Sequence, residues 1–211
     1  MFRNREEAGQ KLAEKLSGEG VGFNRPETIV LAIPRGGIII GQQIAVKFNL
    51  PLDVLVTKKL PAPNNPELAI GAVNENGEAF FLEDLCKDLC ITDVYKKQIV
   101  KEKQTEVFEK KDFFRSGKTP LDLKDKRVVL TDDGAATGAT MLASIKMIKR
   151  QQPKETIVAL PVVALDTLKK LTAEVDRVIY LEAPEMLFSL SEFYKNFCQV
   201  SDQQVIDILG G

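Results

Sequence analysis

Residues 128–140, VVLTDDGAATGAT, combine an apolar run, two adjacent carboxylates and a stretch of very small residues. The run from Val128 to Leu130 is typical of a buried strand. Asp132 and Asp133 follow it, where a parallel strand reaches the carboxyl edge of its sheet. Ligands of open α/β sheets bind in the crevice at that edge. The layout therefore predicts a cradle for a phosphorylated sugar.

Small residues after the acids make this bend suitable for an anion. Five of them have little or no side chain: Gly134, Ala135, Ala136, Gly138 and Ala139. Successive backbone N–H groups can then point into one concavity and close around a phosphate. Thr137 and Thr140 add hydroxyl donors. A helix predicted over 139–150 would direct the positive end of its dipole at the same anion.

The spacing excludes two other phosphate-binding motifs. A Walker-type loop needs Lys and then Ser or Thr after its second glycine, whereas Ala139 and Thr140 follow Gly138. A dinucleotide fingerprint needs GxGxxG after the first strand, and this segment lies late in the chain with different glycine spacing. The remaining alternative is a tight strand-to-helix turn with two capping acids.

The segment resembles the signature of the type I phosphoribosyltransferases, which has four apolar or small residues, two acids, three small residues, Thr, Gly, any residue, then Ser or Thr. The resemblance implies that Asp132 and Asp133 hold the ribose hydroxyls of phosphoribosyl pyrophosphate (PRPP). It also implies that residues 134–140 hold the 5-phosphate. Mg²⁺ is the implied cofactor, bound through PRPP, with Asp132 or Asp133 as its candidate protein contact.

A second candidate loop, Ile33 to Gly37, follows the first predicted strand at the same sheet edge. Its paired glycines, Gly36 and Gly37, let the backbone approach an anion, and Arg35 can bind that anion bidentately. It resembles the pyrophosphate loop of the family, which often contains a strained or cis non-proline peptide bond; we expect that bond at Arg35–Gly36. The alternative is an ordinary glycine turn with a solvated arginine.

Lys58 and Lys59 end the second predicted strand and resemble the basic pair of the family, usually Arg-Lys, that neutralises pyrophosphate. Lysine in the first position keeps the charge but loses bidentate geometry. The stretch at about 59–82 lies where the family has a flexible loop or hairpin that closes over PRPP and excludes water. A plain surface hairpin is the alternative.

The resemblance implies an enzyme that transfers a pentosyl group, with Asp132, Asp133, Arg35 and Lys59 as its catalytic residues. Cations stabilise the departing pyrophosphate while a nitrogenous base attacks C1 of the ribose, as in nucleotide salvage. Leu187 and Phe188 are the candidate base contacts, with hood packing as their alternative role. Residues 160–164, LPVVA, lack the lysine that 6-oxopurine enzymes carry there, which argues against hypoxanthine or guanine.

The amino-acid composition excludes several other kinds of functional site. The chain has no histidine, which excludes Ser-His and Cys-His pairs and zinc sites with histidine ligands. A net charge of −1 gives no global field that would attract nucleic acid. Cys86, Cys90 and Cys198 are expected to be free thiols, the first two on one face of a helix. With no long apolar run and a charged N-terminal segment, we expect a cytoplasmic protein without a membrane partner.

Alternating elements predict an α/β fold with a doubly wound, Rossmann-like parallel sheet. We expect residues 1–211 to form one domain, with a core at about 28–165 and a small variable hood at about 176–200 together with the N-terminal helix. Expected strands lie at 28–33, 52–57, 128–130, 156–162 and 177–181, with a hairpin of 68–73 and 78–82 around Asn76-Gly77. Expected helices lie at 5–16, 38–48, 92–114, 139–150 and 165–172.

The resemblance also implies a homodimer, with PRPP and a small acceptor as its ligands. Two alternatives remain open. One is a PRPP-sensing regulator without turnover, supported only by the lysines between Lys96 and Lys118, which interleaved acids make typical of a solvated helix face. The other is a metal-dependent nucleotide phosphohydrolase, which would need further carboxylates beside the acid pair.

Overall fold

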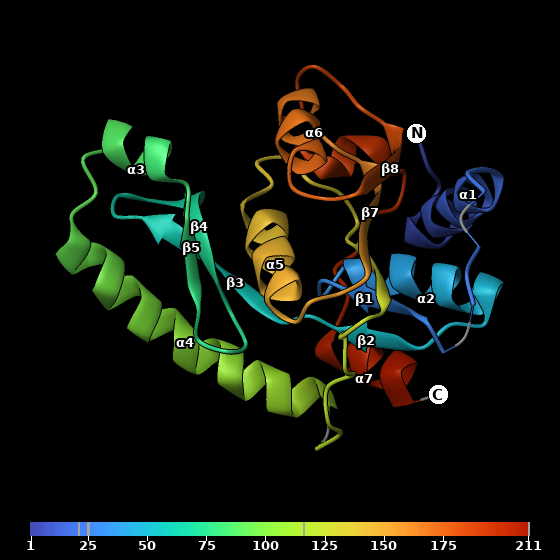
Figure 1. The fold of residues 1–211 in the computed structure, drawn as a ribbon. Coiled ribbons are helices and arrows are strands. Elements are labelled where there is room, and N and C mark those ends of the chain that lie inside the picture. The colour runs from blue at the N-terminus through green and yellow to red at the C-terminus, as the bar shows by residue number, and fades with distance from the viewer. Residues whose placement is uncertain (21, 25, 116, 211) are drawn as a thin grey trace.

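A computed structural model describes residues 1–20, 22–24, 26–115 and 117–210. Its main sheet has five parallel strands in the order β2-β1-β6-β7-β8 (Figure 1). Their bounds are β1 Thr28–Ala32, β2 Leu52–Val54, β6 Arg127–Thr131, β7 Glu155–Val162 and β8 Arg177–Glu182. Strands β1, β6 and β7 read as continuous apolar runs because both faces of the sheet are covered.

Helices cover the two faces of this sheet, as Figure 1 shows. On one face, α1 (Arg5–Gly18) and α2 (Gly37–Phe48) pack on side chains such as Val30 and Val129. On the other, α5 (Ala139–Arg150) and α6 (Leu165–Thr172) pack on their neighbours along the strands, such as Leu31 and Leu130. Alternation along each strand sends successive side chains to opposite cores. The predicted doubly wound α/β fold is therefore confirmed.

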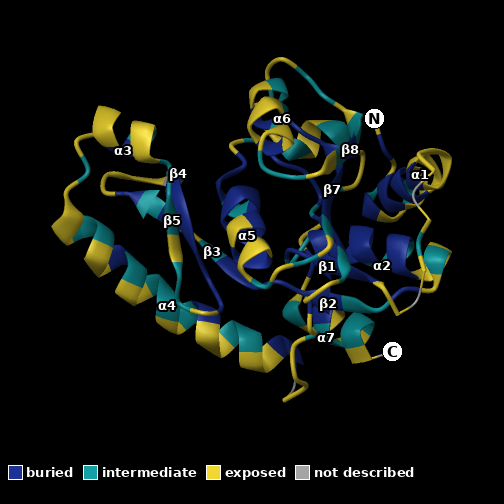
Figure 2. Cartoon of the chain, in the orientation of Figure 1, coloured by how far each residue is buried: buried dark blue, intermediate teal, exposed yellow. Residues whose placement is uncertain are grey.

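A second unit, which we call the arm, projects from the main sheet. It consists of the antiparallel strands β3 (Thr57–Ala62), β4 (Asn65–Asn74) and β5 (Ala79–Phe81), with helices α3 (Glu83–Asp88) and α4 (Asp93–Arg115). Figure 2 shows buried residues in β3 and β4 and along one side of α4. The short C-terminal helix α7 (Asp202–Gly210) packs against α4 and α2.

A buried charge cluster fixes the base of the arm to the main sheet. Arg115, at the end of α4, pairs with Glu75 at 2.8 Å and with Asp53 of β2 at 3.1 Å. Its third nitrogen donates to the carbonyl of Val54. All three charged residues are at most 7% exposed. Since a buried charge without a partner is costly, the cluster holds the arm in one place.

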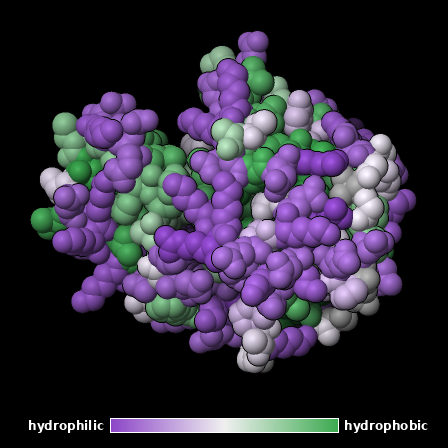
Figure 3. Space-filling model, viewed as in Figure 1, coloured by the Kyte–Doolittle hydropathy of each residue, from purple (hydrophilic) through white to green (hydrophobic). Residues whose placement is uncertain are grey.

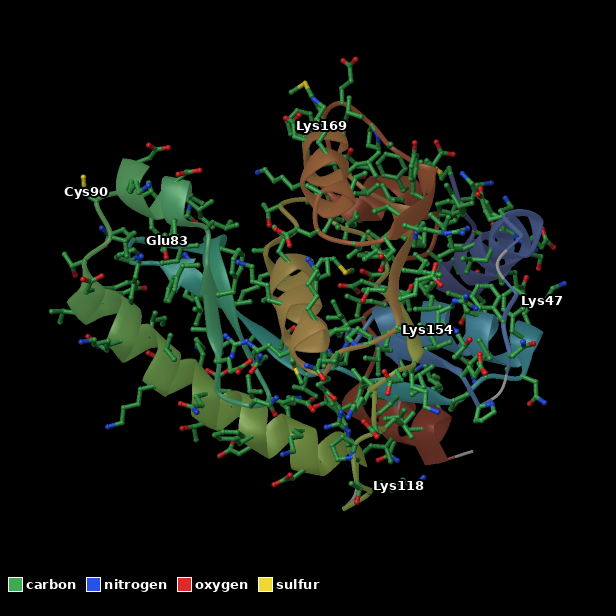
Figure 4. The ribbon with its side chains drawn as sticks, in the orientation of Figure 1. Lys47, Glu83, Cys90, Lys118, Lys154 and Lys169 are labelled. Atoms are coloured by element: carbon green, nitrogen blue, oxygen red, sulfur yellow. The ribbon has the colours of Figure 1, made fainter. Side chains whose placement is uncertain are left out.

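Two predictions about this region were wrong. The predicted strand 52–57 ends at Val54, and Thr57 begins β3 in the other sheet, because the chain leaves the parallel sheet after pairing three residues with β1. Cys86 and Cys90 do not share a helix: α3 ends at Asp88, and Cys90 has a positive φ of 52°. Cys86 is buried, whereas Cys90 is exposed at the outer end of the arm (Figure 4).

Several other predictions, in the arm and on the main sheet, are confirmed. The hairpin around Asn76-Gly77 is formed by β4 and β5, and the Asn74 side chain accepts hydrogen bonds from the amides of Asn76 and Glu78. The predicted helices 139–150 and 165–172 match α5 and α6 residue for residue. After β8, a single turn of 3-10 helix, Leu190–Phe193, interrupts an irregular stretch. None of the helices in the described part of the chain is long and apolar enough to cross a membrane.

Candidate active site

The two predicted phosphate loops meet at the carboxyl edge of the main sheet. The amide of Ile33, just after β1, donates to the carbonyl of Thr131 at the end of β6, at 2.9 Å. The loop from Pro34 to Gly37 therefore lies beside Asp132 and Asp133. A cleft of about 640 Å³ opens there, between these loops and the arm. Figure 3 shows a notch between the arm and the α5–α6 side of the molecule.

The bend after the acid pair is anchored through Ala135 and through the carbonyl of Ala136, which accepts a hydrogen bond from the Thr167 hydroxyl, while its later amides in the described chain are free. Ala135 is bound on both sides: its amide donates to Val162 and its carbonyl accepts from Ala164, both at 2.9 Å. Within the described residues, the next five amides, 136–140, donate no hydrogen bond to the protein. Free amides at the start of a helix are the donors that a phosphate requires.

Gly138 gives the bend its shape. It has a positive φ of 72°, and a Cβ at this position would lie 2.6 Å from Cγ2 of Thr167. Only glycine fits both the conformation and the space. Thr137 is exposed and Thr140 lines the cleft, so their hydroxyls lie at the edge of the same bend. Among the described residues, the amides of 136–140 thus have no protein partner, and the binding of a phosphate by them remains a prediction.

The two acids have different surroundings. Asp132 lines the cleft, and its Oδ1 accepts the amide of Asp133 at 2.8 Å. Burial and the neighbouring Asp133 carboxylate raise the pKa of Asp132 well above its usual value of 3.8, while Lys59 opposes that shift. Asp133 is only 9% exposed and forms an ion pair with Arg5 at 2.7 Å. Asp132 is therefore the acid that faces the cleft.

The paired glycines of the first loop allow a close approach to both acids. A Cβ at Gly36 would lie 1.9 Å from Oδ2 of Asp133, and one at Gly37 would lie 2.8 Å from Cα of Asp132. Every other residue type would force the two loops apart. Between them, the glycines explain why this loop can pack directly on the acid pair.

The expected cis peptide bond lies one residue earlier than predicted. It joins Pro34 and Arg35, and the Arg35–Gly36 bond is trans. Gly36 already has helical dihedral angles, φ −60° and ψ −38°, as the residue before α2. Arg35 lines the cleft, and its Nη1 lies 3.7 Å from a carboxylate oxygen of Asp202.

Cations from the arm line the opposite wall of the cleft. Lys58 and Lys59 lie on β3, and Lys103 and Lys110 on α4. With Arg35 they make five cationic side chains, against Glu106 and Asp132 as the acids of the lining. Such an excess of positive charge is suited to a pyrophosphate group.

Three of the four arm lysines that line the cleft are already paired with acids. Lys58 and Lys103 contact the Glu106 carboxylate at 3.0 and 2.6 Å. Hydrogen bonds from these two lysines lower the pKa of Glu106. Lys110 pairs with Asp202 at the start of α7. Lys103 also contacts the Glu102 carboxylate at 3.0 Å, so a bound anion would have to compete with three carboxylates for these lysines.

Sequence reasoning missed the α4 contribution. Residues 103, 106 and 110 are spaced three and four apart, so they share one helix face. That spacing was a usable signal, but only the position of the arm shows that the face borders the cleft. Arg5 was missed as well, although it lies on the same face of α1 as Ala8 and Leu12, where an arginine is unexpected.

The predicted base contacts lie away from the cleft. Leu187 is half-buried against the core beneath α1 and α2. Phe188 is 78% exposed. Neither residue lines the cleft, so their role as base contacts remains a prediction.

The acid pair also fits the predicted role of Mg²⁺. Burial first, and the neighbouring Asp133 carboxylate second, raise the pKa of Asp132, so a positive charge beside the pair would relieve an unfavourable arrangement. A divalent cation held mainly by substrate phosphates commonly takes one or two such carboxylates as protein contacts. Asp132, which lines the cleft, is the better placed of the two.

Comparisons with known proteins agree with this geometry. Over 212 aligned residues the chain is 31% identical to a Mycobacterium tuberculosis protein named "Putative phosphoribosyl transferase", covering 99% of this chain and 46% of that protein. The chain thus spans about half the length of this relative. The crystal structure of TT1426 from Thermus thermophilus superposes with a TM-score of 0.82 at 31% identity, covering 99% of this chain and 97% of that one.

A more distant likeness extends to fold alone. A hypoxanthine phosphoribosyltransferase of Staphylococcus aureus gives a TM-score of 0.50 at 11% identity, covering 85% of this chain and 75% of that one. The profile of the family described as "Phosphoribosyl transferase domain" matches residues 2–189. The chain, with its acid pair, its bend of free amides and its glycine-paired arginine loop, belongs to the phosphoribosyl transferase domain family.

Proposed function

We propose that the protein transfers the 5-phosphoribosyl group of PRPP to a nitrogenous acceptor and releases pyrophosphate. One observation carries the proposal: five consecutive amides without a protein partner among the described residues follow an acid pair at the edge of a cation-lined cleft. Amides and a helix N-terminus suit the 5-phosphate, carboxylates suit the ribose hydroxyls, and lysines and arginine suit the pyrophosphate.

Each group of site residues binds a different part of PRPP. Residues 134–140 hold the 5-phosphate, while Asp132 and Asp133 orient the ribose. Arg35, Lys58 and Lys59, with the backbone of the Gly36-Gly37 turn, bind the pyrophosphate. Mg²⁺ bound to the pyrophosphate would add positive charge to the same leaving group.

Catalysis then consists of positioning and electrostatics. The bond from C1 to the pyrophosphate oxygen breaks, and its electron pair leaves with the pyrophosphate. Cations at the far wall of the cleft stabilise that charge. The carbon gains positive character, a nitrogen lone pair of the acceptor attacks it to form the new bond, and that nitrogen then releases its proton to solvent or to the departing pyrophosphate. Holding both reactants in one cleft removes most of the entropic cost of their encounter.

We propose a nucleobase as the acceptor class, in a cytoplasmic homodimer. The lack of a lysine in residues 160–164 favours acceptors other than 6-oxopurines. Size-exclusion chromatography with light scattering tests the dimer independently of any activity.

A pyrophosphate-release assay tests the function directly. The protein is incubated with Mg²⁺-PRPP and a panel of nucleobases and related amines, and pyrophosphate is measured for each. The expected result is release that depends on one class of acceptor and is strongly reduced in Lys59→Met. Lys47→Met is the matched control, because Lys47 is an exposed lysine on α2, away from the cleft (Figure 4).

Other outcomes would support different functions. Tight PRPP binding without release for any acceptor would point to a PRPP-sensing regulator. Phosphate release from nucleotides would point to a phosphohydrolase. Either result contradicts the transferase proposal.

A further inference from the structure

Arg5, in the first turn of α1, reaches the acid pair from behind. Its Nε and Nη2 atoms both contact Oδ2 of Asp133, each at 2.7 Å. Neither contact uses Oδ1. Arg5 is only 9% exposed, as is Asp133. This ion pair is therefore shielded from solvent and held at close range, where charge-assisted hydrogen bonds are strong.

The segment after the 3-10 turn fixes the orientation of the same guanidinium. Its remaining nitrogen, Nη1, donates to the carbonyl of Cys198 at 2.7 Å. The ring of Phe197 lies under the group, with its centroid 3.8 Å from Cζ of Arg5. All three nitrogens and one face of the guanidinium are thus engaged, so the group cannot rotate without breaking several contacts.

Two further contacts hold Asp133 itself. The buried Tyr194 hydroxyl donates to the Asp133 carbonyl at 2.6 Å. On the other side lies Gly36, which has no Cβ. A Cβ at this position would lie 1.9 Å from Oδ2 of Asp133 and 3.0 Å from Nε of Arg5, so the glycine leaves room for both groups. Three segments that are distant in sequence therefore meet at Asp133 and its partner Arg5: the N-terminal helix, the arginine loop and the segment 194–198.

Arginine suits this position electrostatically. Two adjacent carboxylates repel each other, and a guanidinium keeps its positive charge at any working pH. Placed on Asp133 alone, it neutralises one acid from the protein side and leaves Asp132 to the cleft. A lysine would keep the charge, but its single ammonium cannot make the side-on contact to Asp133 and the contact to Cys198 with the same geometry.

We propose that Arg5 is a positioning residue for the ribose subsite. By gripping Oδ2, it holds Asp133, and through the adjoining backbone Asp132, in the position from which the acid pair meets the ribose hydroxyls. It also couples that position to the segment 194–198. The inference rests on the proposed function, because it assigns the ribose to this acid pair. It extends the site to a residue of the N-terminal helix that touches no substrate atom.

Calorimetry on Arg5→Lys with three ligands tests the proposal. Ribose 5-phosphate and Mg²⁺-PRPP carry ribose hydroxyls, whereas Mg²⁺-pyrophosphate carries none. We expect the first two to bind about tenfold more weakly than to the unaltered protein, as for the loss of one charge-assisted hydrogen bond. Pyrophosphate should bind unchanged. Arg3→Lys is the matched control, because Arg3 has an exposed side chain, 76% accessible, and should leave all three affinities unchanged.

The other outcomes separate the possible failures. Unchanged affinities in Arg5→Lys would overturn the positioning role, and equal weakening of all three ligands would show a merely structural role and overturn it as well. If the unaltered protein binds pyrophosphate but neither ribose ligand, the proposed function itself fails. Should Arg5→Lys not fold, Tyr194→Phe removes one hydroxyl and no charge, and it must show the same selective loss for the ribose ligands, to a smaller degree; otherwise the proposal is overturned.

Discussion

The main sheet and the arm meet at one cleft but contribute to it in different ways. The main sheet presents backbone: five free amides after the acid pair, and a glycine turn packed against that pair. The arm presents long, charged side chains, and acids of the same protein already pair with three of its lysines, Lys58, Lys103 and Lys110. Under the proposed function, the first wall binds PRPP through backbone groups of fixed geometry. The second binds it through lysines that must give up their present acid partners.

The difference implies distinct sensitivities. Backbone donors are set by the fold, so they respond to changes that move the loops. Side-chain cations respond to single substitutions and to salt, because partly exposed charges are screened. Loss of an arm lysine should therefore be graded and salt-dependent, whereas disruption of the bend or the glycine turn should be abrupt.

The largest effect is expected where the two regions are joined. Arg115→Met leaves the buried carboxylates of Asp53 and Glu75 without their partner. Breaking a buried ion pair in this way costs about 3–5 kcal/mol. Chemical denaturation should show a loss of that order. Lys118→Met, at an exposed position just beyond α4, is the control, and an equal loss there would contradict the role of the cluster.

Gly36→Ala should abolish PRPP binding by disrupting the main-sheet wall of the cleft. Its Cβ would fall 1.9 Å from Oδ2 of Asp133, so the loop and the acid pair must separate. Overpacking of this kind costs about 1–3 kcal/mol of stability. We expect PRPP binding to fall below detection by calorimetry. Gly18→Ala meets nothing within 4 Å and should be neutral. A Gly36→Ala protein that binds PRPP normally would show that the close approach is unnecessary.

Asp132→Asn should weaken PRPP binding and make the folded protein more stable at pH 7. In the folded protein the pKa of Asp132 is raised, so the carboxyl holds its proton at pH values where the unfolded chain has lost it. The resulting penalty is absent below about pH 3.8, grows as the pH rises, and is complete above the raised pKa. Asn carries no such penalty, so the variant should melt at a higher temperature than the unaltered protein at pH 7.

The difference in melting temperature should shrink as the pH is lowered toward about 4, near the ordinary pKa of an aspartate. PRPP affinity at pH 7 should fall by about 1.5–3 kcal/mol, the contribution of a hydrogen bond to a charged group. A variant that is less stable at pH 7, or that binds PRPP as well as before, would contradict the assignment of Asp132.

The smallest effect is expected on the arm. Lys103→Met removes one cation, but it also frees Glu106 from one of its two partners. The loss of pyrophosphate affinity should be only a few fold, about 0.5–1 kcal/mol, and should decrease further in high salt. Lys101→Met, an exposed lysine of the same helix that does not line the cleft, is the control. A large, salt-independent loss would remove the distinction between the two walls.

The sequence predicted the main-sheet wall better than the arm, for a physical reason. Val128 to Thr140 lie in one strand-turn-helix unit, so local pattern and local structure coincide there. The same holds for the glycine turn, apart from the position of its cis bond, which is at Pro34–Arg35.

Contacts that bring together distant segments were not predictable in this way. Lys103 borders the cleft only because the arm folds back, and Arg5 meets Asp133 across 128 positions of sequence. The residues 52–57, LDVLVT, have the pattern of one strand, yet 52–54 belong to the main sheet and Thr57 begins the arm. In each case tertiary packing decides the outcome, and a local pattern contains no information about it.

The central claim is that the bend after the acid pair binds the phosphate of a phosphorylated pentose. Titration of ¹⁵N-labelled protein with ribose 5-phosphate, followed through the amide resonances, tests it residue by residue. We expect the largest shifts at the amides of residues 136–140 and little change along the outer face of α4. Shifts confined to the arm, or no shift at 136–140 while the ligand is bound, would contradict it.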